Sequence, residues 1–235
     1  KLENGLHIKI DKNTLTAGIV TSLKTEDEIV IPKFFEYQSK QYIITYIDKK
    51  AFYLNNNIKS LTFPDDSKIQ KIDDSAFLES TIERLSIPSS LSELGKKWCS
   101  NTKNLFHIEI SPTNKNFIIV NDKFLLGKSS LNSNFDVILF SCRDVKGDIL
   151  ISNEIQQISQ HAFNYCQNIQ AISFDQNSTL KTIDDWSFYG CFNLEYIDPL
   201  PSTVSRVGFQ SFMFPGKLKS VEFLSEEIHI CDSSF

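Results

Sequence analysis

A small residue followed by phenylalanine recurs along this chain at nearly constant spacing. Six copies have Ile or Val five residues before the phenylalanine, and further apolar residues usually stand six, nine and eleven positions after it. Successive copies are 22–25 residues apart, except for one interval of 64 that holds one coil plus an insertion. Such a period indicates a solenoid, because one coil cannot offset the entropy of ordering its backbone and must share a core with its neighbours. Counting a variant copy at Trp98-Cys99, we expect about seven coils, with anchors at Phe52, Phe77, Cys99, Phe163, Phe188, Phe212 and Phe235.

The remaining segments predict a cap and an insertion. Residues 6–20 alternate apolar and polar in two runs joined by Asp11-Lys12-Asn13, which predicts a hairpin, and a second hairpin is expected near Gln38-Ser39-Lys40. Runs at 117–120, 123–126 and 135–140 predict a β-meander that projects from the stack. We therefore expect one continuous solenoid domain with a hairpin cap at 1–46, repeats at 47–113, the inserted meander at 114–148 and repeats at 149–235 that stop within a repeat.

The repeat resembles the BspA-like leucine-rich-repeat family, whose unit is I-x-x-I-x-x-x-A-F-x-x-C-x-x-L-x-x-I-x-I-P. Segments 155–174 and 180–197 carry this unit, and Ile31-Pro32 looks like the approach to that family's first coil. Trp98-Cys99 in place of Ala-Phe, and the longer strand exit at Asp198-Pro199-Leu200, depart from it. The resemblance implies a β-rich α/β solenoid, a right-handed leucine-rich-repeat superhelix. It also implies a secreted or cell-surface antigen of bacteria or protists that binds host proteins.

Composition excludes several partners. The chain carries 24 basic and 29 acidic residues, a net charge of -5, and has no Lys/Arg cluster, so we expect no nucleic-acid partner. It lacks an apolar run of about 18 residues and an initiator Met. We read it as a piece of a longer protein, in which missing segments would supply further coils or any membrane anchor.

No catalytic constellation stands out. The four histidines fall on exposed, scattered positions of the repeat, and phosphate-cradling and nucleophile motifs are absent. We therefore expect no enzyme activity, no small-molecule substrate, no cofactor and no metal.

Two recurring positions have competing interpretations. Cys166 and Cys191 share one repeat position and are read as buried thiols, with an inter-coil disulfide or a metal pair as alternatives. Asp48, Asp73 and Asp184 share another position, where capping of a short helical turn is favoured over a calcium site.

Surface positions on the sheet are the best candidates for partner binding. Residues between the inward-pointing strand positions should face outward on the concave side. Because Tyr, Arg and His often anchor interfaces, we select Arg84, His107 and Tyr196. The inserted meander is an equally good candidate, since long excursions from a regular stack are usually functional. The expected outward-facing residues are Ser60, Thr62, Arg84, Ser86, His107, Glu109, Ala171, Ser173, Tyr196, Asp198, Ser220 and Glu222.

The sequence thus predicts a non-catalytic protein-recognition or adhesion module. Its expected partner is a host cell-surface or extracellular-matrix protein, and its predicted contact residues are Arg84, His107, Glu109, Tyr196, Asp198 and Glu222. The alternative is an intracellular structural scaffold subunit of a larger assembly, favoured by an odd number of cysteines, five, and by the missing signal peptide.

Overall fold

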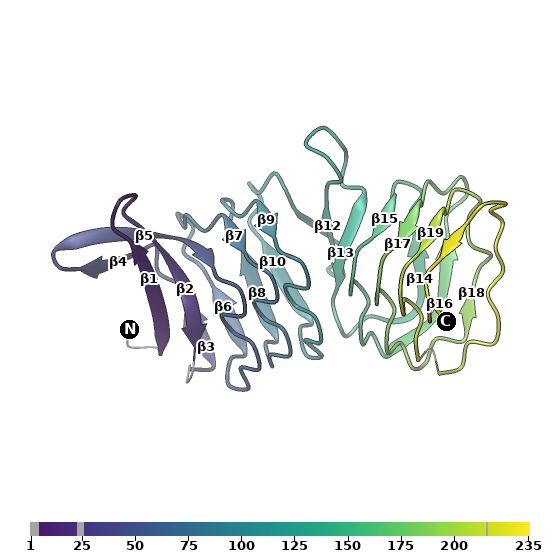
Figure 1. Ribbon diagram of the computed structural model, residues 1–235, viewed down its shortest axis with the longest axis horizontal. Coiled ribbons are helices and arrows are strands. Elements are labelled where there is room, and N and C mark those ends of the chain that lie inside the picture. The colour runs from purple at the N-terminus through teal and green to yellow at the C-terminus, as the bar shows by residue number, and fades with distance from the viewer. Residues whose placement is uncertain (1–4, 23–25, 215) are drawn as a thin grey trace. The chain divides into compact units, whose positions relative to one another are not determined.

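The computed structural model describes residues 5–22, 26–214 and 216–235, and these ranges contain strands and turns but no helix. The expected α component of an α/β solenoid is therefore wrong, and the fold is a β-solenoid. Residues 1–4 and 23–25 of the predicted cap lie outside the described residues. The chain divides into two compact units, residues 1–116 and 117–235, each of which is described by itself below (Figure 1).

The first unit contains two sheets, and most coils contribute one strand to each. Their order is β1-β2-β5-β7-β9, with β4 beside β5, and β10-β8-β6-β3. Both predicted hairpins are present as antiparallel pairs, β1 with β2 and β4 with β5, whereas the repeat strands pair in parallel. The strands of the first sheet are β1 (Leu6–Asp11), β2 (Thr16–Ser22), β4 (Phe34–Tyr37), β5 (Lys40–Ile47), β7 (Lys71–Ile72) and β9 (Glu93–Leu94). Those of the second are β3 (Glu28–Val30), β6 (Ser60–Thr62), β8 (Arg84–Ile87) and β10 (His107–Ile110).

The second unit also has two sheets, ordered β11-β12-β13-β15-β17-β19-β20 and β14-β16-β18. β12 pairs antiparallel with both β11 and β13, and the remaining pairs are parallel. The strands of the larger sheet are β11 (Ile118–Val120), β12 (Phe124–Gly127), β13 (Val137–Ser141), β15 (Gln157–Ile158), β17 (Thr182–Ile183), β19 (Arg206–Val207) and β20 (His229–Ile230). The smaller sheet contains β14 (Lys146–Ile151), β16 (Asn168–Phe174) and β18 (Tyr196–Ile197).

The insertion lies partly inside the stack. A meander is formed by β11, β12 and β13, but β13 also pairs in parallel with β15, and β14 pairs in parallel with β16. Val137 and Ile138 are buried, so this segment contributes to the core although it lacks the small-residue–phenylalanine signature. When coils that lack this signature are included, the solenoid has about nine turns, against the seven expected from the repeat.

A turn with left-handed residues replaces the expected helical turn around each anchor. Residues two positions before and two after the anchor have φ between 51° and 75°. In the second unit the amides of Phe163 and Tyr165 donate to Ser187 and Tyr189 of the next coil at 2.7 and 2.8 Å, while the amide of Asn164 bonds within its own turn. A helix would direct every amide back along its own chain. Here successive amides donate alternately to the neighbouring coil and to their own turn, so these turns are not helical. The left-handed residues are Lys50, Leu54, Ser75, Glu79, Lys97, Asn101, His161, Tyr165, Trp186, Gly190, Gln210, Phe214 and Ser233.

The anchor side chains stack through the core of each unit. Phe163 and Phe188 lie 4.7 Å apart between ring centroids, and Phe188 and Phe212 lie 5.0 Å apart, with their planes within 8° of parallel. In the first unit Phe52 stacks on Phe77 at 4.9 Å. Trp98 of the variant copy meets Phe77 edge-on at 6.5 Å and is buried, so this coil keeps an aromatic contact without the phenylalanine.

Truncation of the central ring of this stack should be strongly destabilising. We expect Phe188→Ala to lower the free energy of unfolding by about 3–5 kcal/mol, because the ring is buried between two others and leaves a cavity. Phe192→Ala, at a half-exposed phenylalanine of the same unit, should cost less than half as much. Urea denaturation followed by circular dichroism measures both, and equal losses would show that the stack has no special role.

Candidate functional site

The outward face of sheet β10-β8-β6-β3 contains three of the predicted contact residues. Strand pairing aligns Glu28, Ser60, Arg84 and His107 in one row and Val30, Thr62, Ser86 and Glu109 in the next. Leu61, Leu85 and Ile108 between these rows are buried, whereas Arg84, His107 and Glu109 are exposed. The structure therefore brings these three side chains onto adjacent strands of one face.

An ion pair crosses this row. A guanidinium nitrogen of Arg84 lies 3.2 Å from a carboxylate oxygen of Glu28, two strands away. Ser60 stands between them in the register and is only 9% exposed, so the expectation that it faces solvent is wrong, because the pair passes over it. Both charged side chains remain largely exposed, so the pair orients Arg84 more than it stabilises the fold.

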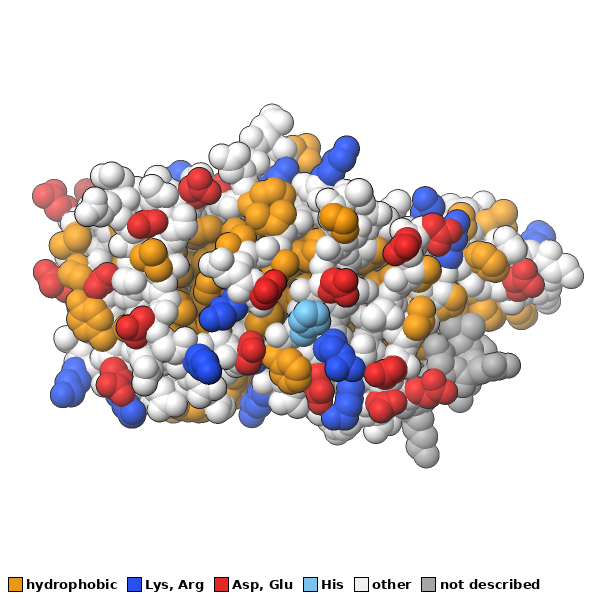
Figure 2. All heavy atoms as spheres, turned by 180° about the vertical axis from the view of Figure 1, so that it is seen from behind, with side chains coloured by type: hydrophobic (Ala, Val, Ile, Leu, Met, Phe, Trp, Pro, Cys, Tyr) orange, Lys and Arg blue, Asp and Glu red, His pale blue; other side chains and the backbone are white. Residues whose placement is uncertain are grey.

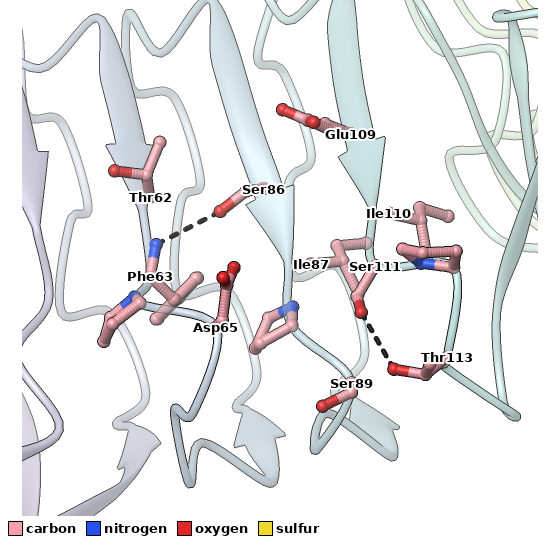
Figure 3. A pocket seen from close by; sticks show the side chains of 13 residues that line it. Thr62, Phe63, Asp65, Ser86, Ile87, Ser89, Glu109, Ile110, Ser111 and Thr113 are labelled. Carbon is pink, nitrogen blue, oxygen red and sulfur yellow. Dashed lines mark hydrogen bonds between the residues drawn. The ribbon is translucent and has the colours of Figure 1, made fainter.

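A groove of about 480 Å³ lies where β6, β8 and β10 end (Figure 3). Thr62, Ser86 and Glu109 come from the strands, and Asp65 comes from the turn after β6. The amide of Phe63 donates to the Ser86 hydroxyl at 3.2 Å, which ties two neighbouring coils together at the edge of the groove. The other lining residues are Phe63, Pro64, Ile87, Pro88, Ser89, Ile110, Ser111, Pro112 and Thr113.

Two carboxylates of the groove are available to a ligand. Within the described ranges, neither Glu109 nor Asp65 forms an ion pair. The wall beside them is held by the buried amide of Asn114, which donates to the carbonyls of Pro88 and Leu91 at 2.8 and 3.0 Å. The groove thus offers fixed hydroxyls, proline rings and negative charge.

Sequence reasoning missed part of this surface. It placed residues 28–30 in the cap, whereas β3 continues the sheet in parallel with β6 and adds Glu28 and the exposed Val30 to the face. The signal was present in Ile31-Pro32, which repeats the strand exit of Phe63-Pro64 and Ile87-Pro88.

The other three predicted contact residues belong to the second unit. Tyr196 in β18 is 55% exposed and aligns with Ala171 and Asp148 of the neighbouring strands. Its hydroxyl donates to the Asp198 carboxylate, and this hydrogen bond together with the negative charge raises the pKa of Tyr196. Glu222, the third of these residues, is also exposed. Tyr196 and Asp198 are therefore brought together, on a different unit from Arg84, His107 and Glu109.

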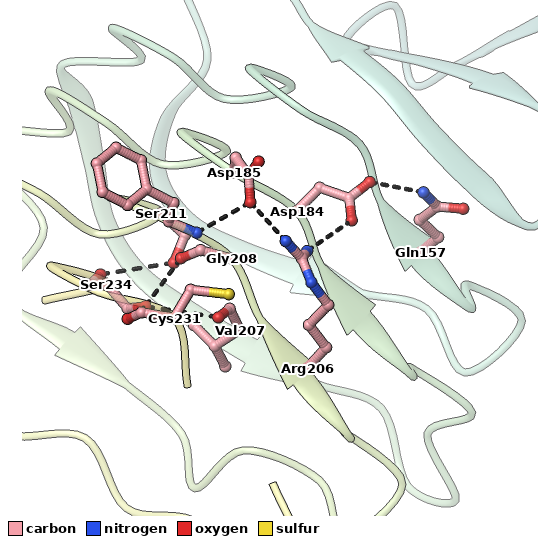
Figure 4. A network of polar contacts seen from close by, with 10 residues as sticks. Gln157, Asp184, Asp185, Arg206, Val207, Gly208, Ser211, Cys231 and Ser234 are labelled. Atoms are coloured by element: carbon pink, nitrogen blue, oxygen red, sulfur yellow. Dashed lines mark hydrogen bonds and ion pairs between the residues drawn. The ribbon is translucent and has the colours of Figure 1, made fainter. Parts of the chain in front are cut away.

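The recurring aspartates have a structural role (Figure 4). Arg206 contacts Asp184 at 3.2 Å and Asp185 at 2.6 Å, and Asp185 also accepts the amide of Phe209 in the next coil at 2.9 Å. Burial raises the pKa of Asp184, and the hydrogen bond from Gln157 and the positive charge of Arg206 partly offset this rise. Gly208 is required beside this network, because a Cβ there would lie 2.4 Å from the Asp185 amide nitrogen. Of the three predicted positions, Asp48 and Asp73 accept the amides of the residues that follow them, at 2.8 and 2.7 Å, whereas Asp184 accepts the side chains of Gln157 and Arg206. None of the three caps a helical turn, and the amide of the neighbouring coil is accepted by Asp185.

None of the five cysteines, all of which lie in the described ranges, forms a disulfide, and Cys99, Cys142, Cys166 and Cys191 are buried. The thiol of Cys191 donates to the Phe163 carbonyl at 3.3 Å, and Arg143 contacts the Cys166 sulfur at 3.5 Å. Burial raises the pKa of Cys166, partly offset by Arg143, and raises that of Cys191 further. The interpretation of this position as buried thiols thus agrees with the structure.

Thiol reactivity should separate these cysteines. We expect one thiol, that of the partly exposed Cys231, to react rapidly with Ellman's reagent in the folded protein, because thiolates react and the other four thiols are inaccessible. Cys231→Ser should remove the rapid phase. A rapid phase of more than one thiol per chain would contradict this arrangement.

Histidine placement differs from the sequence prediction at two positions, since His7 and His161 are only partly exposed. His161 was expected to be exposed, but its ring is partly buried and stacks on Trp186 with centroids 5.3 Å apart. The left-handed backbone at both residues aligns their side chains along the stack. Among the residues that the structure describes, no group of three or more His, Cys, Asp or Glu side chains could hold a metal ion. The described ranges also hold no helix that is long and apolar enough to cross a membrane.

The connection between β12 and β13 rises above its sheet as a loop of residues 128–136 (Figure 1). Asp136, only 2% exposed, fixes this loop. Its carboxylate accepts the amide of Ser129 at 2.8 Å, the hydroxyl of Ser129 at 2.6 Å and the side-chain amide of Gln156 at 3.1 Å. Burial alone would raise the pKa of Asp136, but the hydrogen bonds from Ser129 and Ser133 lower it overall. Leu131 at the tip is 94% exposed.

Neutralising this carboxylate should have a pH-dependent effect. Because the folded-state pKa is lowered, the stabilisation by Asp136 is full above the ordinary value of about 3.9 and is lost as the pH falls through the lower folded value. We expect Asp136→Asn to lower the free energy of unfolding by about 1–3 kcal/mol at pH 7 and by less at pH 3. Urea denaturation at the two pH values measures this. Asp148→Asn, at an exposed position in β14, is the control, and a loss independent of pH would contradict the assignment.

A second hollow, of about 540 Å³, lies beside this loop and is lined only by polar residues. Loop residues form one wall, and turns after β14 and β16 form the other. The lining residues are Asn132, Ser133, Asn134, Asp136, Asn153, Glu154, Gln156, Asn177 and Thr179.

Charge on the molecular surface is mixed. On the face drawn in Figure 2, acidic and basic side chains are interspersed. No broad basic surface of the kind that tracks a phosphate backbone is seen on that face.

Short parallel strands repeated every 22–25 residues, with apolar positions facing a shared core, define a leucine-rich-repeat β-solenoid. Residues 34–135 and 138–235 match the family described as the BspA type leucine rich repeat region, in six copies. The chain belongs to this family. The comparison with curated proteins finds no match.

Solved structures share the fold. A leucine-rich repeat protein of T. pallidum, TpLRR, is 19% identical, with a TM-score of 0.54 over 94% of this chain and 91% of the other. One from Eubacterium ventriosum is 16% identical, with a TM-score of 0.53 over 83% and 66%. The pneumococcal vaccine antigen PcpA is 14% identical, with a TM-score of 0.50 over 98% and 76%.

Proposed function

We propose that this chain is a non-catalytic protein-recognition module whose partner binds the outward face of sheet β10-β8-β6-β3 and the groove beside it. The observation that carries the proposal is the continuity of the two surfaces. Glu109 lies on the same exposed face as His107 and Arg84, in the neighbouring row, and also lines the groove. A partner segment lying along the strand ends would contact both at once.

The chemistry of the surface indicates what kind of segment fits. Glu109 and Asp65 favour a partner that carries Lys or Arg, while Arg84 and His107 supply side chains of the types that serve as interface anchors. The proline rings and hydroxyls of the groove suit an extended backbone. Tyr196, Asp198 and Glu222 are proposed as a second, separate contact area on the other unit.

We place the proposed partner among host cell-surface or extracellular-matrix proteins, with this chain on a cell surface or secreted as an adhesion module or surface antigen. Membership of the BspA-type repeat family supports this, as does the likeness in fold to a protein described as a vaccine antigen. None of the three solved structures reported above is described as an enzyme, which supports a non-catalytic role.

The alternative, an intracellular scaffold subunit, is favoured by one observation. The five cysteines, all in the described part of the chain, form no disulfide, and cysteines without disulfides are typical of reducing compartments. Antibody labelling of intact, unpermeabilised source cells separates the two candidates. Surface labelling supports the adhesion module, and labelling only after permeabilisation supports the scaffold.

Charge reversal in the groove should disrupt recognition. We expect the purified chain to bind saturably to one or more proteins of an extracellular-matrix panel, and Glu109→Lys to weaken that binding at least about tenfold, because truncating or reversing an interface charge costs more than about 1.4 kcal/mol. Glu226→Lys, an exposed position outside both surfaces, is the matched control. Biolayer interferometry measures the affinities.

Two outcomes would contradict the proposal. One is the absence of saturable binding to any matrix or cell-surface protein under conditions in which a control adhesin binds. The other is equal affinity of wild type and Glu109→Lys, with circular dichroism confirming that both are folded.

A further inference from the structure

The polar hollow beside the inserted loop has a lining unlike that of an ordinary ligand pocket. Small-molecule sites are mostly apolar with a few polar groups, whereas all nine residues that line this one are polar. Its volume of about 540 Å³ lies within the usual range for small ligands, about 300–1,000 Å³. A ligand that fits would therefore be recognised mainly by hydrogen bonds to polar side chains.

Some of the lining residues hold the walls of the hollow together through hydrogen bonds, and the side chains of others face the hollow. Gln156 donates to Asp136 and accepts from Lys181 at 2.6 Å, and the Thr179 hydroxyl donates to the Asn153 carbonyl at 2.6 Å, so these residues hold the walls. In the described part of the chain, the side-chain amides of Asn132, Asn134, Asn153 and Asn177 form no hydrogen bond with another residue. Four amides, each both a donor and an acceptor, therefore surround the hollow.

The walls are organised in advance of any ligand. Asp136 fixes the loop that carries Asn132 and Asn134 through its bonds to Ser129 and Gln156. The opposite wall belongs to the coils, where the Thr179 hydroxyl ties the turn that contains Asn177 to the turn that contains Asn153. Binding to a surface held in this way loses little conformational entropy.

Charge narrows the class of ligand. Asp136 and Glu154 are the only charged lining residues and both are acidic, so a phosphate, sulfate or carboxylate group would be repelled. Apolar peptide side chains would find no aliphatic or aromatic side chain in the lining. Hydroxyl groups both donate and accept, as amides do, and a ligand with many closely spaced hydroxyls matches four amides around one hollow.

We propose that the hollow between the 128–136 loop and the turns at Asn153 and Asn177 binds neutral carbohydrate. The site is separate from the protein-binding face of the first unit, and it adds a second class of ligand to the proposed function. A glycan on a cell surface and a free sugar share the recognised chemistry, namely an array of neutral hydroxyls.

An array of neutral and sialylated oligosaccharides, probed with the full chain, tests the proposal. The protein is produced in a host without N-glycosylation, because Asn177-Ser178-Thr179 is an acceptor pattern and modification would occupy Asn177. We expect binding to one or more neutral glycans and none that depends on sialic acid. Competition with free hexoses then distinguishes the sources: competition assigns the site to single sugars, and its absence assigns it to longer chains of a surface glycan.

Matched variants locate the site. Asn153→Ala and Asn177→Ala should each weaken glycan binding about tenfold in isothermal titration, the effect of losing about one well-placed hydrogen bond. Asn168→Ala, an exposed asparagine of the same unit outside the hollow, should leave the affinity unchanged. Glu109→Lys should also leave it unchanged, so failure of the protein-binding proposal and failure of this one are distinguishable.

Three results would overturn the proposal. They are no binding to any neutral glycan, binding that requires an acidic sugar, and binding to a neutral glycan that Asn153→Ala and Asn177→Ala leave intact. Circular dichroism of each variant, compared with wild type, establishes that a lost affinity does not reflect a lost fold.

Discussion

Hydrogen bonds that pass from one coil to the next at the anchor turns hold this fold together. Placing every second amide toward the neighbour requires left-handed residues on both sides of the anchor, and nearly all of these are not glycine. Each such residue costs roughly 1 kcal/mol or more in backbone strain. The stacked phenylalanines beneath the turns offset that strain, because they bury large apolar surfaces at the same spacing as the hydrogen bonds.

This arrangement decides where recognition can occur. Residues of the core and of the anchor turns contact neighbouring coils. The residues that remain accessible to a partner lie at outward strand positions, at strand ends and in the inserted loop of residues 128–136. The groove and the polar hollow occupy the last two of these locations. In each case a buried side chain, Asn114 for the groove and Asp136 for the hollow, fixes the wall through its hydrogen bonds.

The repeat was predictable from sequence because it rests on apolar spacing, and the two hairpins were predictable from alternation and turn residues. The helical turn was wrong, since Ala-Phe flanked by polar residues also suits a left-handed turn, and only the neighbouring coil decides between them. Outward rows followed from strand periodicity, although the ion pair over Ser60 and the strand at 28–30 depend on tertiary pairing. Neither hollow was predicted, because each is assembled from residues on several coils whose individual types are unremarkable.

The bonds between Asp136 and Ser129 also bear on how related chains can vary. They close the loop at its base, next to the strands, where Phe135 packs against the core, while Leu131 at the tip is exposed. For a loop closed in this way, doubling the number of residues costs only about 0.6 kcal/mol of closure entropy. Insertions beside the exposed Leu131 are therefore thermodynamically mild. The tip of this loop is thus a place where the sequence, and with it the binding specificity, can vary while strand pairing still constrains the repeats.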